Sequence, residues 1–181
     1  MKVKDTIIQI DSDSKNPLRA HAREITKDEF SSVYLRDVIS SMKQVLARES
    51  DGVAIAAPQI AIGIRLFVVA PNSYDEDAKL KPLVFINPKI TKRSKKTAIM
   101  QEGCLSVRWI YGKTKRSIAC TIEAYDEEGK KFTYGGKGLL AHIFQHEVDH
   151  LDGVLFIDHG FDLEEYTEEE VREVERKEKG K

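Results

Sequence analysis

The five residues at positions 146 to 150 are the part of this sequence best suited to chemistry. They read His-Glu-Val-Asp-His, which matches the metal-binding pattern H-E-x-x-H. Histidines four positions apart lie on one face of an α-helix, so His146 and His150 can bind the same metal ion. Glu147 lies between them, where a carboxylate can move a proton on a water bound at the open side of the metal. The competing interpretation is a surface helix that carries two histidines by chance.

The residues around this motif predict a buried helix. Leu139, Leu140, Ile143 and Leu151 recur at helical spacing, and Gly153 is placed to end the helix. Burying two histidines and a glutamate costs free energy unless these groups are paired or bound to a metal. The predicted burial therefore favours a metal site over a chance pattern.

The third metal ligand decides the class of enzyme, because a catalytic metal usually takes three protein ligands and leaves one position for water. One class of peptidases has a third histidine six positions after the second, but Phe156 stands there. Another class takes a glutamate from a helix further downstream, and the glutamates at positions 168 to 170 are available. Their place in the first turn of a predicted helix already gives them a capping role.

Cys104 is the strongest other candidate for the third ligand. It lies in Glu-Gly-Cys-Leu-Ser at 102–106, outside any clear periodic segment, and Gly103 allows the backbone to approach a site closely. Cys120 alternates within a predicted strand, as a small core residue does. His142 precedes His146 by one turn, but three ligands from one straight helix cannot enclose an ion. We therefore expect His142 to be a packed or partly exposed side chain.

The composition describes a soluble globular protein. The chain has 181 residues, of which 41% are apolar and 33% charged, and its net charge is −1. This predicts a single catalytic domain at 1–181, with a core at about 5–160 and a helical tail at 161–181. Residues 1 to 5 lack the apolar core of a signal peptide, and no apolar run approaches the roughly 20 residues of a membrane span. We therefore expect a cytoplasmic protein with reduced cysteines and neither a DNA nor a membrane partner.

Apolar periodicity predicts the elements that position the motif. Thr26 and Glu29 form a capping box, and the apolar residues after them predict a helix of roughly 20 residues. Apolar segments at 66–69, 83–86 and 117–125 predict strands, and Asp-Glu-Glu-Gly at 126–129 predicts a hairpin turn. The pattern indicates an α+β fold, in which short, mostly antiparallel strands pack around the buried central helix that carries the motif.

Two charged segments complete the pattern. Thr167 and Glu170 form a second capping box, which predicts a C-terminal helix whose only apolar residues are Val171 and Val174. We expect its final turns to be loosely held. Five positive charges at positions 89 to 96 predict a solvated loop between strands, and contact with RNA is the alternative.

Three motifs together resemble the peptide deformylase family. Glu-Gly-Cys-Leu-Ser at 102–106 resembles the second motif of that family, and His-Glu-Val-Asp-His, preceded by Gln145, resembles the third. The first motif is a glycine-rich stretch ending in Ala-Ala-x-Gln, and Gly-Val-Ala-Ile-Ala-Ala-Pro-Gln at 52–59 resembles it. The similarity covers roughly residues 5 to 160. Three motifs in order are far more specific than any one of them.

The resemblance implies the ligands, the metal and the substrate. Cys104, His146 and His150 would hold a divalent ion, most often Fe²⁺ in the family, with Zn²⁺, Ni²⁺ or Co²⁺ able to take the same ligands. Glu147 would be the general base and acid. The implied substrate is a nascent polypeptide that begins with N-formylmethionine and is hydrolysed to formate and a free N-terminus. Ribosome contact through the tail or residues 89 to 96 is a further hypothesis.

The resemblance also implies residues that contact the substrate. The side-chain amide of Gln59 and the backbone N–H of Leu105 match the donors that stabilise the oxyanion, although a loop-capping role is the alternative for Gln59. The substrate-binding positions that match are Gly52, Val53, Ala54 and Gly103. Arg116 matches a family arginine, which we expect to pair with Glu102.

Two departures from the family pattern bear on substrate preference. Ala54 stands where the first motif usually has a second glycine, so its methyl group is expected to narrow the pocket or to constrain φ. The segment Val-Arg-Trp-Ile-Tyr at 107–111 is bulkier and more basic than is usual after the second motif. The alternatives are therefore a deformylase-like protein with altered substrate or reduced activity, an H-E-x-x-H metallopeptidase, and a purely structural metal site.

Overall fold

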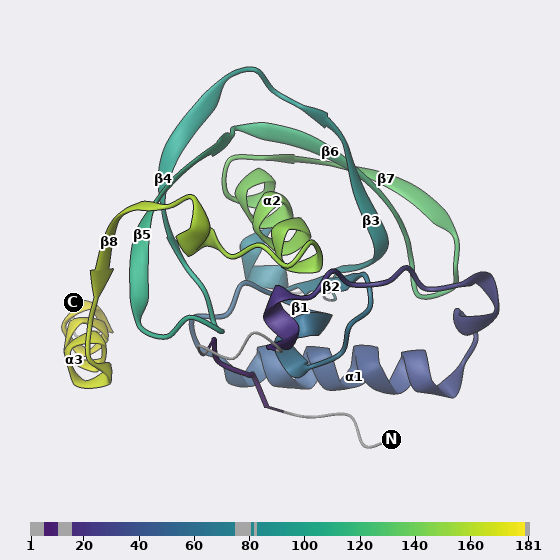
Figure 1. Ribbon diagram of the computed structural model, residues 1–181, viewed down its shortest axis with the longest axis horizontal. Helices are drawn as coiled ribbons and strands as arrows, with labels where there is room; N and C mark the ends of the chain where they lie inside the picture. Colours follow the sequence, from purple (N-terminus) through teal and green to yellow (C-terminus); the bar gives the residue numbers. More distant parts are fainter. Residues whose placement is uncertain (1–5, 11–15, 75–80, 82, 180–181) are drawn as a thin grey trace.

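Two antiparallel sheets surround a central helix, α2, in the computed structural model (Figure 1). The model describes residues 6–10, 16–74, 81 and 83–179. Residues 1 to 5, on which the expectation of a missing signal peptide rests, lie outside this part of the chain. The predicted α+β class and the central position of the motif helix are confirmed.

The larger sheet has five strands in the order β1-β2-β3-β6-β7, and the smaller has three in the order β4-β5-β8. Neighbouring strands within both sheets are antiparallel. The strands of the larger sheet are β1 (Ala54–Ala56), β2 (Leu66–Val69), β3 (Leu83–Arg93), β6 (Ala119–Tyr125) and β7 (Lys131–Lys137). Those of the smaller sheet are β4 (Thr97–Gly103), β5 (Ile110–Ser117) and β8 (Phe161–Glu165).

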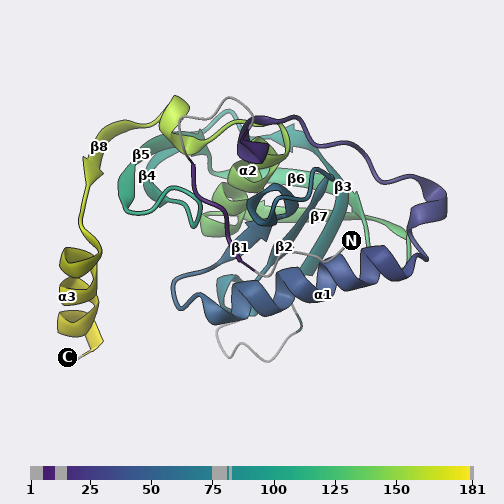
Figure 2. The ribbon, with the colours of Figure 1, turned by 60° about the horizontal axis from the view of Figure 1, so that its bottom comes forward.

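Three α-helices complete the fold: α1 (Val33–Arg48), α2 (Leu139–Leu151) and α3 (Glu168–Lys179). Helix α1 runs along β1 and β2, whereas α3 lies at one end of the molecule, where it follows β8 (Figure 2). Helix α2 contacts strands of both sheets, including β5, β6 and β7. No helix among the described residues is long and apolar enough to cross a membrane.

Helix α2 is buried because its apolar residues pack against the larger sheet. The ring of Phe144 contacts those of Phe67, Phe85 and Tyr134. A Cβ atom at Gly136 would lie 2.9 Å from the Phe144 ring, so glycine is what permits this close approach of β7 to the helix. Gly153 follows the helix with φ +74°, which confirms the predicted end.

The first helix begins later than the sequence predicts. Thr26 and Glu29 do form a capping box, in which the Thr26 N–H donates to the Glu29 carboxylate at 2.8 Å, but it closes a separate 3₁₀ turn at Lys27–Glu29. Ser32 is extended, and its hydroxyl accepts from the Leu35 N–H at 3.1 Å, so it is the N-cap of α1. The prediction of one continuous helix from Thr26 was therefore wrong at its start.

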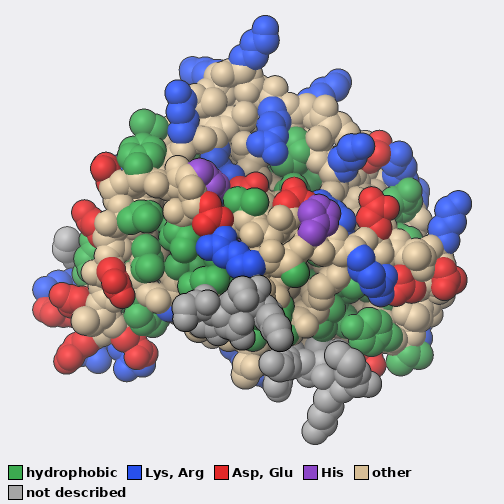
Figure 3. Space-filling model, viewed as in Figure 1, with side chains coloured by type: hydrophobic (Ala, Val, Ile, Leu, Met, Phe, Trp, Pro, Cys, Tyr) green, Lys and Arg blue, Asp and Glu red, His purple; other side chains and the backbone are tan. Residues whose placement is uncertain are grey.

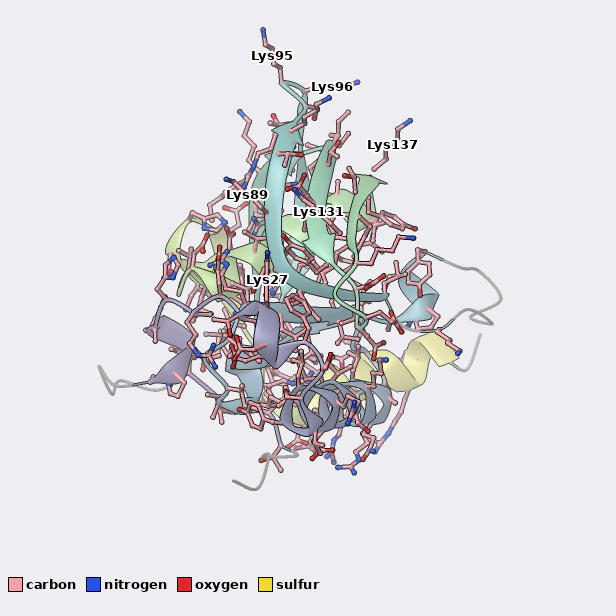
Figure 4. The ribbon with its side chains drawn as sticks, turned by 90° about the vertical axis from the view of Figure 1, so that its right-hand side faces the viewer. Lys27, Lys89, Lys95, Lys96, Lys131 and Lys137 are labelled. Atoms are coloured by element: carbon pink, nitrogen blue, oxygen red, sulfur yellow. The ribbon has the colours of Figure 1, made fainter. Side chains whose placement is uncertain are left out.

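The basic segment at 89–96 is mostly strand, so the prediction of a loop was wrong. Strand β3 continues to Arg93, since Lys89 pairs with Glu123 and Ile90 with Ile122 on β6. The charged side chains occupy exposed positions, so the sequence pattern did not indicate this half-buried strand. Only the residues at 94–96 turn, and Figure 4 shows Lys95 and Lys96 at this tip.

The other predicted β elements are confirmed, but several strands were not predicted. The expected strand at 66–69 is β2, and the turn at 126–129 joins β6 to β7. Strands β1, β4, β5 and β8 were missed because β1 is short, β5 and β8 are rich in charge, and the one fully buried residue of β4 is the charged Glu102. Figure 3 shows exposed hydrophobic side chains over the smaller sheet; those on β4 and β8 are Ile99, Phe161 and Leu163.

Candidate active site

The structure brings together the three residues predicted to bind a metal. Cys104 directly follows the end of β4, and His146 and His150 lie one turn apart on α2. One ligand atom from each residue lies within 4.8 Å of those from the other two. The Sγ atom of Cys104 is 3.2 Å from Nε2 of His150. Both Cys104 and Cys120 are free thiols, as expected.

Of two buried polar atoms near this site without a partner in the described part of the chain, the one on Glu147 supports the presence of a ligand, because Glu147 lines the cavity. Oε2 of Glu147 and Nδ1 of His150 are buried and have no hydrogen-bond partner among the described residues. Such atoms are rare in proteins, because losing water without a replacement bond costs free energy. One thiolate with two imidazoles is a donor set that suits several divalent transition metals. The residues therefore fit a catalytic metal ion.

Glu102 orients His146 through a buried network of hydrogen bonds. Its Oε1 accepts from Nδ1 of His146 at 2.5 Å and from Arg116 at 2.7 Å, and its Oε2 accepts from Nε2 of His142 at 2.6 Å. The Thr114 hydroxyl donates to the same carboxylate. Because Nδ1 of His146 donates to Glu102, Nε2 keeps the lone pair that a metal requires.

Burial and neighbouring charges shift the titration of these groups. Burial raises the pKa of Glu102, but hydrogen bonds from His142, His146 and Arg116 outweigh it and hold the pKa well below the usual range. Burial raises the pKa of Glu147 to about 7. Burial also lowers the pKa of His150, while contacts with Cys104 and Glu102 overcome burial and raise that of His146. A carboxyl group with a pKa near neutrality is suited to general acid–base chemistry.

Gln59 reaches the site and also caps its own turn. Its Oε1 accepts from the Ala56 N–H at 2.8 Å, as the capping interpretation expects. Its Nε2 donates to Oγ of Ser106 at 3.2 Å and lies 3.7 Å from Sγ of Cys104. The capping bond thus fixes the amide so that its N–H group faces the metal ligands. Leu105, the other predicted donor, is buried next to Cys104.

The predicted substrate-binding residues share one cavity with the catalytic residues. The cavity has a volume of about 680 Å³, a size that encloses a drug-sized ligand. Its lining includes Cys104, His146 and Glu147 but not His150, which is 1% exposed. The lining also includes the remaining predicted residues Gly52, Val53, Ala54, Gln59, Gly103 and Leu105.

The two departures from the family pattern both border this cavity. Ala54 lies in β1, and it is not among the three described non-glycine residues with positive φ, so alanine causes no strain there. Ala54 lines the cavity, and the narrowing expected from its methyl group stays a prediction. Arg108 forms ion pairs with Glu49 at 2.7 Å and Asp51 at 2.6 Å, which tie the segment after β4 to the segment after α1. The basic character of this segment therefore has a structural role.

Part of the Glu102 network was predicted and part was missed. The pairing of Arg116 with Glu102 and the packing of His142 are confirmed. The bonds from His142 and Thr114 to Glu102 were not predicted. One signal was available, because Thr114 and Arg116 alternate along one strand and so face the same side.

The glutamates at 168–170 do not join the metal ligands. They occupy the first turn of α3 and are exposed, and Thr167 forms the predicted capping box with Glu170. The metal-ligating group found among the described residues contains Cys104 instead. This arrangement does not support the metallopeptidase alternative.

Comparisons with known proteins agree with this geometry. A family model described as polypeptide deformylase matches residues 6–166. A peptide deformylase from Desulforudis audaxviator is 39% identical over 145 residues, which cover 78% of this chain and 85% of that protein. A solved structure of Arabidopsis thaliana peptide deformylase 1B with an inhibitor has a TM-score of 0.76 at 34% identity and covers 87% of this chain and 82% of that one. A solved structure of a class I type b peptide deformylase from Acinetobacter baumannii, with Met-Ala-Ser bound, has a TM-score of 0.75 at 28% identity. The match covers 86% of this chain and 99% of that one.

The fold and the site define a hydrolase built to use one catalytic metal held between a helix and a sheet. The match over most of the chain then gives the family. The chain belongs to the peptide deformylase family. It is therefore a hydrolase of protein biosynthesis, which removes the formyl group from the N-terminal formylmethionine of nascent polypeptides.

Proposed function

We propose that the chain performs this hydrolysis with Cys104, His146 and His150 as ligands of Fe²⁺, and that Zn²⁺, Ni²⁺ or Co²⁺ can replace it. The observation that carries this proposal is the meeting of the three ligand atoms within 4.8 Å beside a buried glutamate. A divalent ion bound there supplies hydroxide near neutral pH.

Glu147 is the proton carrier in this proposal. It accepts a proton as water adds to the formyl carbon, and it delivers that proton to the amine nitrogen as the C–N bond breaks. Formate and a free N-terminus are the products. Burial of Glu147, which is 3% exposed, keeps its carboxyl group out of bulk water and holds its pKa near neutrality.

Gln59 and Leu105 stabilise the negative charge that develops on the formyl oxygen. The Gln59 amide is held in place before substrate arrives, because its oxygen is already bonded to Ala56. Donors fixed in advance need no reorganisation during the reaction, and losing one typically costs roughly 10²–10³ in rate. Gly52, Val53, Ala54 and Gly103 border the peptide in the same cavity.

Replacing Cys104 with serine tests the ligand set. We expect Cys104→Ser to lose both stoichiometric metal and formate release from formyl-Met-Ala-Ser, measured on anaerobically purified, iron-loaded protein. Cys120→Ser is the matched control, since Cys120 lies buried in β6 and is not a member of the metal-ligating group. Full metal content in Cys104→Ser would contradict the proposed ligands.

The cellular partner that we propose is the ribosome in the cytoplasm, where nascent chains emerge. Lys95 and Lys96 project from the tip of the β3–β4 turn, and Lys89 and Lys137 lie on the same side (Figure 4). Within the described part of the chain, none of these four lysines forms an ion pair. Unpaired cations on an exposed tip suit contact with RNA phosphates, which is weakened by salt.

Sedimentation with ribosomes tests this surface. The parent protein is expected to cosediment at low salt and to be released at high salt, and Lys95→Glu/Lys96→Glu is expected to abolish cosedimentation. Arg176→Glu/Lys177→Glu makes the same charge change on α3 and serves as the control. Loss of binding only in the α3 variant would place the contact on the tail instead.

A further inference from the structure

The C-terminal helix contributes to the wall of the catalytic cavity. Of the twelve residues of α3, only Val171 and Val174 are apolar, and both line the cavity that holds Cys104 and Glu147. The opposite side of α3 carries charged residues, including Glu169 and Arg172, which line a separate shallow surface depression. The one apolar pair of the helix is thus directed at the catalytic cavity.

Partly exposed apolar side chains line one side of the mouth of this cavity. Val174 is 54% exposed, Leu139 is 48% exposed and Tyr166 is 37% exposed, and all three line the cavity. They come from three separate segments: α3, the start of α2, and the connection between β8 and α3. Apolar side chains that surround a cavity and remain half-exposed offer surface that a ligand can bury.

The segment that leads into α3 is held by the sheet that also positions Cys104. Strand β8 pairs with β5, and the Tyr166 N–H donates to the Trp109 carbonyl at 3.1 Å. The rings of Tyr111 and Tyr166 meet edge to face, with centroids 5.9 Å apart. Tyr111 in turn packs against Gly103, the residue before Cys104, where an added Cβ would lie 2.8 Å from the ring.

We propose that Tyr166, Val171 and Val174 form an apolar subsite for the third and fourth residues of the peptide substrate. This inference rests on the proposed catalytic site. The formyl group must lie beside Glu147, and the formylmethionine leads the rest of the peptide away from that point. The peptide therefore leaves through the mouth, where α3 meets it. The subsite prefers apolar side chains because the α3 residues that line it offer only apolar surface.

Binding of product peptides tests the subsite without requiring catalysis. Trp109 is the single tryptophan of the chain and lines the cavity, so its fluorescence can report binding of Met-Ala-Leu-Leu, Met-Ala-Ser-Ser and Met-Ala. We expect the parent protein to bind the leucine peptide about tenfold more tightly than the serine peptide, as burial of roughly 50 Å² or more of apolar surface gives. In turnover, the same preference is expected in KM for the formylated peptides.

Alanine variants of α3 separate the subsite from the stability of the helix. Val171→Ala/Val174→Ala should lose most of the preference for leucine. Because alanine favours a helix more than valine does, a weaker helix would not explain this loss. Binding of Met-Ala should change less than twofold. Glu169→Ala/Arg172→Ala, on the charged side of α3, should keep the full preference.

Three outcomes would overturn the subsite: no preference for leucine in the parent, a preserved preference in the valine variant, or an equal loss for Met-Ala. Failure of the proposed catalytic site gives a different result, which is no formate release from any formylated peptide while the binding preference persists.

Discussion

Replacing Glu147 with glutamine is expected to lower kcat for formate release by about 10²- to 10⁴-fold while the metal stays bound. Glutamine preserves the shape of the side chain but cannot accept or deliver a proton. The three metal ligands are untouched, so the metal content should remain that of the parent. Formate release from formyl-Met-Ala-Ser and elemental analysis of the same samples measure the two quantities.

Glu123→Gln is the control for the Glu147 variant. Glu123 is a carboxylate on β6 that pairs with Lys131 at the surface, so its loss should leave kcat unchanged. Parent-level turnover in Glu147→Gln with bound metal would show that another group carries the proton.

Removing the Glu102 carboxylate is expected to weaken both the fold and the metal site. Glu102→Ala leaves the guanidinium of Arg116 buried with Asp149, at 2.8 Å, as its remaining charged partner among the described residues. Breaking a buried ion pair in this way typically costs about 3–5 kcal/mol of unfolding free energy. His146 also loses the acceptor that orients its ring, so metal affinity should fall about 10- to 100-fold.

Urea unfolding of metal-free protein and competition with a metal chelator measure these two effects separately. Glu127→Gln is the control, because the pair of Lys43 and Glu127 is exposed and should contribute less than about 1 kcal/mol. If Glu102→Ala unfolded at the same urea concentration as the parent, the network would not stabilise the fold as argued.

The central helix and its motif could be predicted because their pattern is local. The spacing of His146 and His150, the apolar residues around them and Gly153 all lie within one helix, and the structure agrees with each. Cys104 comes from the distant segment after β4; its place beside Gly103, outside any periodic segment, made it a candidate ligand, and the family motif supported that choice. The single-domain assignment over 1–181 stays a prediction.

The missed features depend on contacts between distant segments. The length of β3 could not be read from its charged residues, because pairing with β6 decides it. The hydrogen bonds from Thr114, His142 and His146 to Glu102 come from β5 and α2, which are brought together only by the fold. In the sequence, Val171 and Val174 suggested a loosely held helix. Their place in the cavity could not be predicted, because it depends on the pairing of β8 with β5.

The placement of Cys104 and His150 has a consequence for the chain as a polymer. The two residues are 46 positions apart, one at the edge of the smaller sheet and one on the helix packed against the larger sheet. An ion held by both closes a loop of that length and joins the two sheets at a point where no strand pairing connects them. Closing a long loop restricts the unfolded chain, so the catalytic centre is also a cross-link that ties the halves of the molecule together.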